Sequence, residues 1–224
     1  NMNNLTLLIP AKQEAGSLPL VLEELKKYDC NKLIVLSDDD LETINAIKEF
    51  DCEILYQNKK GYGSALIEGI NKINTDYLCI FNADGSFDPI YLEEMLNNFN
   101  NNLDFVFASR YSLKGKTDDD TFLTFIGNKI FSSIGNIFFR LGIDDILFTF
   151  VMGKTKSFQN LQLKNSDFRF CVELPIKAKR NGNKYINMGS HERKRLKGYK
   201  KVSEFKDGFL ILIELIRLFL KRKN

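Results

Sequence analysis

Three oxygen-bearing side chains follow a short apolar segment in the first half of the chain. Tyr77 to Phe81 is a continuous apolar run, the pattern of a strand buried on both faces, and Asn82, Asp84 and Ser86 lie just after it. Mg²⁺ and Mn²⁺ bind such oxygens together with substrate phosphates, and open α/β sheets bind ligands at the carboxyl ends of their strands. The segment therefore predicts a metal-dependent phosphate site. The alternative interpretation is a strand followed by an Asp-Gly turn.

Two further polar loops follow other predicted strands. Residues 59–63 (Lys-Lys-Gly-Tyr-Gly) precede a predicted helix, and N–H groups at a helix start, aided by a cation, commonly hold phosphates. Their spacing matches neither a P-loop nor a G-x-G-x-x-G fingerprint. Asp38, Asp39 and Asp40 either accept hydrogen bonds from a base or ribose or cap the helix that comes next.

Strands and helices alternate along the first half of the chain. Apolar runs predict strands at residues 5–9, 32–36, 52–56, 77–81 and 105–108, and helical spacing predicts helices at 16–28, 41–50, 65–73 and 90–99. Four successive alternations indicate an α/β fold with a parallel sheet and right-handed crossovers. Farther on we expect a flexible loop near the site at 112–120, a helix at 122–141 and a short strand at 185–188. Residues 165–181 are expected to contain a helix, with Pro175 as a kink or boundary.

Composition indicates one large folded domain. The 224 residues are 44% hydrophobic and 12% aromatic, enough to fill a sizeable core. Residues 151–224 hold 19 Lys and Arg against 6 Asp and Glu, so the last third is a basic pole that suits phosphates or an anionic membrane surface. We expect no nucleic-acid partner. The four dispersed cysteines form no C-x-x-C pair, which favours free thiols and a cytoplasmic protein.

The end of the chain predicts an amphipathic helix. Asp207, Glu214, Arg217 and Lys221 fall on one narrow stripe, and residues 209–220 are otherwise apolar. These twelve residues, two of them charged, are too few to span a bilayer. The helix either lies in a membrane interface, which would make the protein peripheral at the cytoplasmic face of the membrane, or packs onto the domain or a partner.

Several stretches, in chain order, resemble motifs of family 2 glycosyltransferases. They are 10–14 (Pro-Ala-Lys-Gln-Glu, for P-x-x-N-E), 58–66 (for N-x-G-x-G-x-A), 82–84 (Asn-Ala-Asp, for D-x-D) and 108–111 (Ala-Ser-Arg-Tyr, for G-S-R-Y). Three more resemble the branch that loads sugars onto polyprenyl phosphates: 127–128 (Gly-Asn), 145–150 (for D-x-x-x-G-F), and 191–193 with 198–200 (for R-x-x-G-x-S-K). The resemblance runs from about residue 5 to residue 201.

The resemblance implies a GT-A fold, a Rossmann-like, mostly parallel sheet flanked by helices. It also implies a nucleotide sugar linked to UDP, GDP or dTDP, and Mg²⁺ or Mn²⁺ as cofactor. Residues 1–201 would form the glycosyltransferase domain, with 1–111 binding the nucleotide sugar and 112–201 the acceptor. Residues 202–224 would form the amphipathic helix.

Carried over by position, the resemblance assigns the site residues. Catalytic roles would fall to Asp84, Arg110, Asp145 and Arg193, the two arginines neutralising pyrophosphate or acceptor phosphate. Asp84 would bind the metal, with Asn82 and Ser86 as further ligands. The residues implied to border the nucleotide or its phosphates are Pro10, Ala11, Gln13, Glu14, Asp38, Asp39, Lys60, Gly61, Gly63, Asn82, Ala83 and Lys200.

The expected reaction is inverting sugar transfer from the nucleotide to a polyprenyl phosphate at a membrane surface. Such an acceptor is already anionic, so positioning and charge stabilisation would suffice. The first alternative is a glycan or small-molecule hydroxyl acceptor, which requires a base, with Asp145 or Glu173 as candidates. A sugar nucleotidyltransferase and a non-catalytic binding protein are further alternatives. A homo-oligomer is left open.

Overall fold

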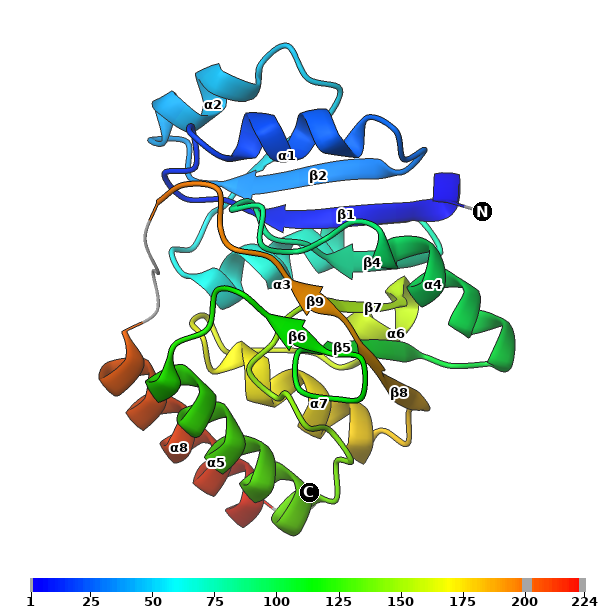
Figure 1. The fold of residues 1–224 in the computed structure, drawn as a ribbon, viewed down its shortest axis with the longest axis vertical. Helices are drawn as coiled ribbons and strands as arrows, with labels where there is room; N and C mark the ends of the chain where they lie inside the picture. Colours follow the sequence, from blue (N-terminus) through cyan, green and yellow to red (C-terminus); the bar gives the residue numbers. More distant parts are fainter. Residues whose placement is uncertain (1, 199–202, 222–224) are drawn as a thin grey trace.

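A seven-stranded sheet forms the centre of the molecule (Figure 1). The computed structural model describes residues 2–198 and 203–221. The strand order is β3-β2-β1-β4-β7-β5-β8, and every pairing is parallel except the two that β7 makes. The bounds are β1 (Leu5–Pro10), β2 (Asn31–Leu36), β3 (Glu53–Tyr56), β4 (Tyr77–Ile80), β5 (Phe105–Ser109), β7 (Val151–Lys154) and β8 (Tyr185–Gly189).

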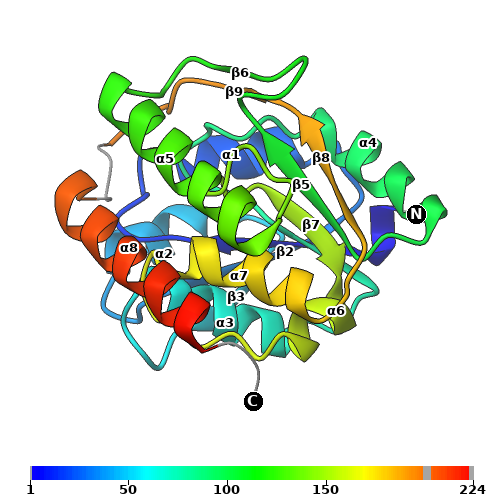
Figure 2. The same cartoon turned by 90° about the horizontal axis from the view of Figure 1, so that it is seen from below.

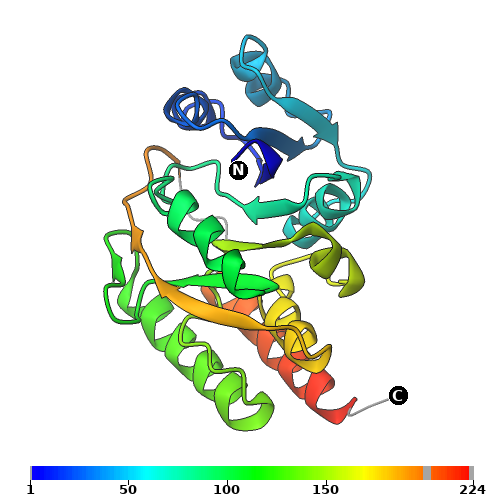
Figure 3. The same ribbon diagram turned by 90° about the vertical axis from the view of Figure 1, so that its right-hand side faces the viewer.

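Helices cover both faces of this sheet. One apolar cluster joins one face to α1 (Leu18–Leu25), α2 (Leu41–Ile47) and α4 (Tyr91–Asn97). A second joins the other face to α3 (Tyr62–Lys72), α6 (Thr155–Asn160) and α7 (Phe170–Arg180), with α8 (Glu204–Leu220) packed behind them. The helix α5 (Phe122–Phe139) lies beside α8 at the end of the molecule remote from α1 and α2 (Figures 1 and 3). The predicted α/β class is confirmed.

Strand β7 is the main element that the sequence pattern did not predict. Its four residues lie between β4 and β5, antiparallel to both, with Met152 opposite Cys79 on one side and Val106 on the other. Gly153 is required there, because a Cβ would lie 2.5 Å from the Phe105 ring. A second, two-stranded sheet pairs β6 (Lys116–Thr117), within the segment expected to be a loop, with β9 (His191–Glu192).

Two other predictions about helices are corrected. The helix α3 begins at Tyr62 rather than near Ala65, so it includes part of the glycine loop. The helix α7 continues through Pro175, so that residue is not a helix boundary. All four cysteines are free, as predicted.

The C-terminal helix α8 packs on the protein through part of its polar stripe. Glu214 is buried and accepts a hydrogen bond from the Asn165 Nδ2 at 2.9 Å, and Ile211, Leu215 and Leu218 enter the core beside it. The interpretation of α8 as a helix packed onto the domain is therefore confirmed for this face. Its opposite face is exposed and apolar.

Candidate active site

The carboxyl ends of the parallel strands bring most of the predicted site residues to one edge of the sheet. Residues 10–14 follow β1, residues 38–40 follow β2, residues 82–86 follow β4, and Arg110 follows β5. The segment after β9 crosses this edge (Figure 1), because the Leu196 N–H donates to the Asp84 carbonyl and the Arg193 N–H to the Ser86 carbonyl. Ligand binding at this edge is what the topology of an open α/β sheet favours.

Asp84 is fixed by the turn that it begins. Its Oδ1 accepts hydrogen bonds from the Ser86 backbone N–H at 2.9 Å and from the Ser86 hydroxyl at 2.7 Å. The Asn82 Nδ2 donates to the same hydroxyl at 3.5 Å, so the three residues predicted to bind the metal belong to one cluster. Gly85 has a positive φ of 84°, which glycine adopts without strain, and lies against Leu196. The second carboxylate oxygen, Oδ2, faces Arg195.

Arg195 is the cation beside Asp84, and the sequence reasoning did not identify it. Its guanidinium lies 3.7 Å from the Asp84 Oδ2 and donates to the Asp119 Oδ2 at 2.6 Å. Asp119 belongs to the acidic run of the loop that was predicted near the site. Arg195 is one-fifth exposed, so it can contact both the protein and a ligand.

Arg193 is bound to protein groups beside the Asp84 turn, and its catalytic role stays a prediction. Its guanidinium forms a two-point ion pair with Glu24 at 2.8 and 2.9 Å. It also donates to the carbonyls of Gly85 and Phe87. Through these bonds the guanidinium joins α1 to the Asp84 turn. The hydrogen-bonded ion pair with Arg193 lowers the pKa of the Glu24 carboxyl.

Replacing Glu24 with Gln is expected to reduce the loss of unfolding free energy that occurs as the pH falls from 7 to 3. A carboxyl whose folded pKa lies below its unfolded value of 4.5 stabilises the fold above that value, and this stabilisation is lost as the pH falls through the folded pKa. Urea unfolding at pH 7 and pH 3 measures the difference. The neighbouring Glu23→Gln is the control, because Glu23 is exposed and pairs with Lys26 on the same helix. Equal pH sensitivity in all three proteins would contradict the assignment.

Arg110 and Asp145, both predicted to be catalytic, form a buried ion pair, and those roles stay predictions. Both Arg110 Nε and the Arg110 backbone N–H donate to the Asp145 Oδ2, at 2.9 and 2.8 Å, and Nη2 donates to Oδ1 at 2.8 Å. The third guanidinium nitrogen donates to Glu192, and the Phe148 ring covers the group at 4.7 Å. Burial raises the pKa of Asp145, although Arg110 opposes this shift. In this arrangement Arg110 holds the loop before β7.

Glu173, the other candidate base, is also bonded to protein groups. It is fully buried in α7, and its carboxylate accepts hydrogen bonds from the backbone N–H groups of Lys164 and Asn165 at 2.9 and 2.8 Å. The Lys177 ammonium lies 2.8 Å away. Neither Asp145 nor Glu173 therefore offers a free carboxylate oxygen to an acceptor hydroxyl.

Gly61 and Gly63 allow a loop to approach the start of α3. A Cβ on Gly63 would lie 2.0 Å from the Asn165 carbonyl oxygen, and one on Gly61 would lie 2.1 Å from the Ser166 carbonyl oxygen. The Ser64 N–H donates to that Ser166 carbonyl at 3.1 Å. Protein carbonyls lie against this helix start, and the phosphate cradle expected there stays a prediction. Lys60 remains exposed nearby.

Replacing Gly63 with Ala is expected to destabilise the protein by about 1–3 kcal/mol, the usual range for overpacking. The added methyl would overlap a backbone carbonyl that no rotamer change can move. Gly127→Ala is the matched control, because a Cβ there meets nothing within 4 Å, and alanine favours the interior of α5 by about 0.5–1 kcal/mol. Urea unfolding should separate the two variants. Equal stabilities would refute the packing role.

The loops after β1 and β2 are joined by a hydrogen bond. The Asp40 side chain caps α2 and accepts a hydrogen bond from the Gln13 N–H at 2.6 Å, so capping is confirmed for one of the three aspartates. Asp38 and Asp39 are exposed at the same edge, as is the Gln13 side chain. The half-exposed Glu14 accepts a hydrogen bond from the Ser17 hydroxyl, and Ala11 is buried. Lys200 lies outside the described residues.

The Asp84 cluster fits Mg²⁺ or Mn²⁺ only with help from a substrate. It offers one carboxylate, the Asn82 amide oxygen and the Ser86 hydroxyl. The described residues contain no group of three or more His, Cys, Asp or Glu suited to a metal. Hard cations prefer a larger set of oxygens, so diphosphate oxygens are expected to complete the coordination.

Asn82→Asp is expected to raise the affinity for Mn²⁺ in the presence of a nucleoside diphosphate, because it adds a second negative ligand. A hydrogen bond or contact to a charged group contributes about 1 kcal/mol more binding free energy than one to a neutral group. A gain of about 5-fold to 10-fold in Mn²⁺ affinity is therefore expected. Calorimetric titration of Mn²⁺ measures it. An unchanged affinity would place Asn82 outside the metal site.

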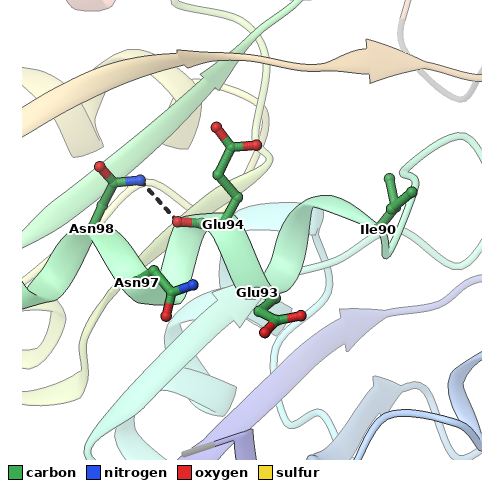
Figure 4. A pocket seen from close by; sticks show the side chains of 5 residues that line it. All are labelled: Ile90, Glu93, Glu94, Asn97 and Asn98. Carbon is green, nitrogen blue, oxygen red and sulfur yellow. Dashed lines mark hydrogen bonds between the residues drawn. The ribbon is translucent and has the colours of Figure 1, made fainter.

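A shallow depression on α4 is a separate feature. Ile90, Glu93, Glu94, Asn97 and Asn98 line it, and Glu93 and Glu94 point in different directions (Figure 4). It has two carboxylates and no basic side chain, so it does not suit a phosphate.

The profile of Glycosyl transferase family 2 matches residues 6–162, which contain β1 to β7 and the Asp84 turn. The chain belongs to glycosyl transferase family 2. Glycosyltransferases of Mycobacterium bovis and Mycobacterium tuberculosis, both described as uncharacterized, are 23% identical to it over 208 residues, which is 93% of this chain and 94% of theirs.

Solved structures share the fold of this glycosyltransferase. Glucosyl-3-phosphoglycerate synthase from Mycobacterium tuberculosis, in complex with Mn²⁺, UDP and glucosyl-3-phosphoglycerate, superposes with a TM-score of 0.76 at 10% identity, covering 98% of this chain and 81% of that one. The complex of that enzyme with Mn²⁺, UDP-glucose and phosphoglyceric acid gives a TM-score of 0.73 at 11% identity, with the same coverage. The expected GT-A type of fold is confirmed.

Proposed function

We propose that this family 2 glycosyltransferase transfers a sugar from a nucleoside diphosphate sugar to a phosphate-bearing acceptor, with Mg²⁺ or Mn²⁺ as cofactor. The observation that carries the proposal is the Asp84 turn, whose Oδ2 faces the Arg195 guanidinium at the carboxyl edge of the sheet. A carboxylate beside a cation suits a metal–diphosphate complex, since each group matches one charged component.

Different residues of this chain would bind the metal, the diphosphate and the nucleoside of the donor. Asp84, with Asn82 and Ser86, would hold the divalent cation, which when bound neutralises charge on the leaving diphosphate. Arg195 can release Asp119 and donate to diphosphate oxygens, the task first assigned to Arg193. The exposed Asp38, Asp39 and Gln13 lie at the same edge and are available to the nucleoside.

The basic segment after β9 supports an anionic acceptor. Lys194 and Lys197 are exposed on either side of Arg195, in a segment that crosses the site edge. Such a segment attracts phosphates. A small phosphorylated molecule that accepts the sugar on a hydroxyl is our first candidate, because the solved structures with this fold hold phosphoglyceric acid or its glucosyl product.

A polyprenyl phosphate is the second candidate acceptor. The observation in its favour is the set of exposed apolar side chains on α5 and α8. These helices lie at one end of the molecule (Figure 1). A lipid phosphate would also make a general base unnecessary, which agrees with the engaged carboxylates of Asp145 and Glu173.

Calorimetry with UDP-, GDP- and dTDP-sugars, each with and without Mn²⁺, tests the donor. Metal-linked binding of at least one nucleotide sugar is the expected result, and its absence from all three would overturn the proposal. Product formation with 3-phosphoglycerate and with a short polyprenyl phosphate then distinguishes the acceptors. Transfer to neither, together with transfer to a neutral glycan, would contradict the anionic acceptor.

A further inference from the structure

The helices α5 and α8 lie side by side and run in the same direction (Figures 1 and 2). At their starts, Glu204 of α8 accepts hydrogen bonds from the hydroxyls of Thr121 and Thr124, both at 3.0 Å. At their ends, the Phe219 ring contacts those of Phe138 and Phe139, with centroids 5.3 and 6.2 Å apart. The two helices therefore form a single platform along their whole length.

The outward surface of this platform is apolar. Large apolar side chains are exposed on both helices at helical spacing, so they form two adjacent stripes. They are Phe122, Leu123, Ile126, Ile130, Ile137 and Phe138 on α5, and Phe205, Phe209, Leu212, Ile213, Ile216 and Leu220 on α8. Several are more than two-thirds exposed, among them Phe122 at 79% and Phe205 at 81%. Soluble monomers rarely leave so large a contiguous apolar patch in water.

The exposed charged side chains that border this surface are basic. Lys206, Arg217 and Lys221 are exposed along one side of the α8 stripe, and Lys129 is exposed on α5. Two of the three acidic groups of α8 bond to other protein side chains: Glu204 to the threonines, and Glu214 to Asn165 and Arg217. The third, Asp207, accepts a hydrogen bond from the Ser203 N–H at the helix start. An apolar face bordered by basic residues complements an anionic bilayer.

We propose that the outward face of α5 and α8 docks on an anionic phospholipid bilayer, with both helices lying in the plane of the interface. A second copy of this chain would bury the apolar stripes but would bring the like-charged borders together, so charge favours the bilayer as the occupant. The proposal does not depend on the proposed reaction.

The inner face of α5 argues for lying in the interface rather than crossing the membrane. Among the described residues α5 is the one helix long and apolar enough to span, judged by length and composition alone. Its buried polar side chains, however, hold the loop before β7: Asn128 accepts the Leu147 N–H and Ser132 accepts the Ile146 N–H, both at 3.0 Å. Moving α5 into the hydrocarbon would leave these groups without partners.

The platform ends beside the candidate active site. The rings of Tyr111 and Phe125 contact edge to face at 5.3 Å, which links the start of α5 to the segment after Arg110. Asp119, which holds Arg195, lies in the loop that leads into α5. A bilayer under the platform would therefore place membrane-borne phosphates close to the site edge.

Vesicle flotation of the full chain tests the proposal. We expect binding to vesicles of phosphatidylcholine and phosphatidylglycerol in equal parts, and weaker binding to phosphatidylcholine alone. The variant Ile130→Ser/Ile137→Ser/Phe209→Ser/Ile216→Ser should lose at least about 10-fold in partitioning, since bound apolar area sets interfacial affinity. Leu20→Ser/Leu41→Ser removes exposed apolar side chains at the opposite end and should bind as the unmodified chain does.

A charge variant and a mass measurement make the test decisive. Lys206→Glu/Lys221→Glu should weaken binding to the anionic vesicles while leaving the weak binding to phosphatidylcholine unchanged. The proposal is overturned if the unmodified chain ignores anionic vesicles, or if the apolar variant floats as well as the unmodified chain. It is also overturned if light scattering shows a dimer that the apolar variant dissociates while neither protein floats, because a second copy would then be the occupant. Since flotation needs no donor, failure of the reaction and failure of docking are distinguishable.

Discussion

Replacing Asp84 with Asn is expected to remove the metal dependence of nucleotide binding and to reduce Mn²⁺-dependent affinity for UDP by about 100-fold. The substitution keeps the shape and one oxygen but removes the only carboxylate of the cluster formed with Asn82 and Ser86. Charge-assisted contacts contribute about 1.5–3 kcal/mol, which converts to roughly 10-fold to 150-fold. Calorimetry of UDP with and without Mn²⁺ is the measurement.

The control for this variant is Asp29→Asn. Asp29 is exposed just before β2, at the amino edge of the sheet, so the substitution makes the same change of charge away from the site. Metal-linked UDP binding that survives in Asp84→Asn would locate the metal elsewhere. An equal loss in both variants would show that net charge, and not the Asp84 turn, determines the affinity.

Replacing Asp145 with Asn should destabilise the fold by about 3–5 kcal/mol, because it leaves the buried Arg110 cation without its main partner. Asp145 receives three of the hydrogen bonds that Arg110 donates, and Arg110 is only 7% exposed. The free energy of unfolding in urea measures the loss. If this pair is structural, as the geometry indicates, the native fraction of the variant should retain metal-linked nucleotide binding.

Asp118→Asn is the matched control, since Asp118 is a partly exposed aspartate of the neighbouring loop. It should change the free energy of unfolding by less than about 1 kcal/mol, as for other exposed ion pairs. A small effect of Asp145→Asn, within the range of the control, would refute the structural role. Loss of nucleotide binding without loss of stability would support the catalytic assignment of Asp145.

The first five strands were predictable because each is a continuous apolar run bounded by turn residues, and their bounds agree to within one or two residues. Because Asp84 and Arg110 each follow a strand of a predicted parallel sheet, they are expected at the same edge, where the carboxyl ends of the strands meet. Strand β7 was not predictable in this way. It has four residues, one of them Gly153, and its position depends on pairing with two strands distant in sequence.

The arginines show where sequence reasoning about the site ends. Arg193 and Arg195 are two residues apart in one basic segment, and no local pattern separates them. In the fold, Arg193 forms an ion pair with Glu24 on α1, whereas Arg195 lies between Asp119 and Asp84. The glycine loop is a similar case, because the carbonyls of residues 165 and 166 that fill its helix start lie about a hundred residues farther along the chain.

The position of β7 also has a consequence for the order in which the chain assembles. The sub-sheet β3-β2-β1-β4 is complete once residue 80 has been made, whereas β5, buried along its whole length, pairs with β7 and β8. Its first partner is synthesised about 45 residues later, which at typical translation rates of about 5–20 residues per second is an interval of roughly 2–9 s. During that interval the nascent chain presents an unpaired apolar strand, so β5 is expected to be a binding segment for chaperones during synthesis.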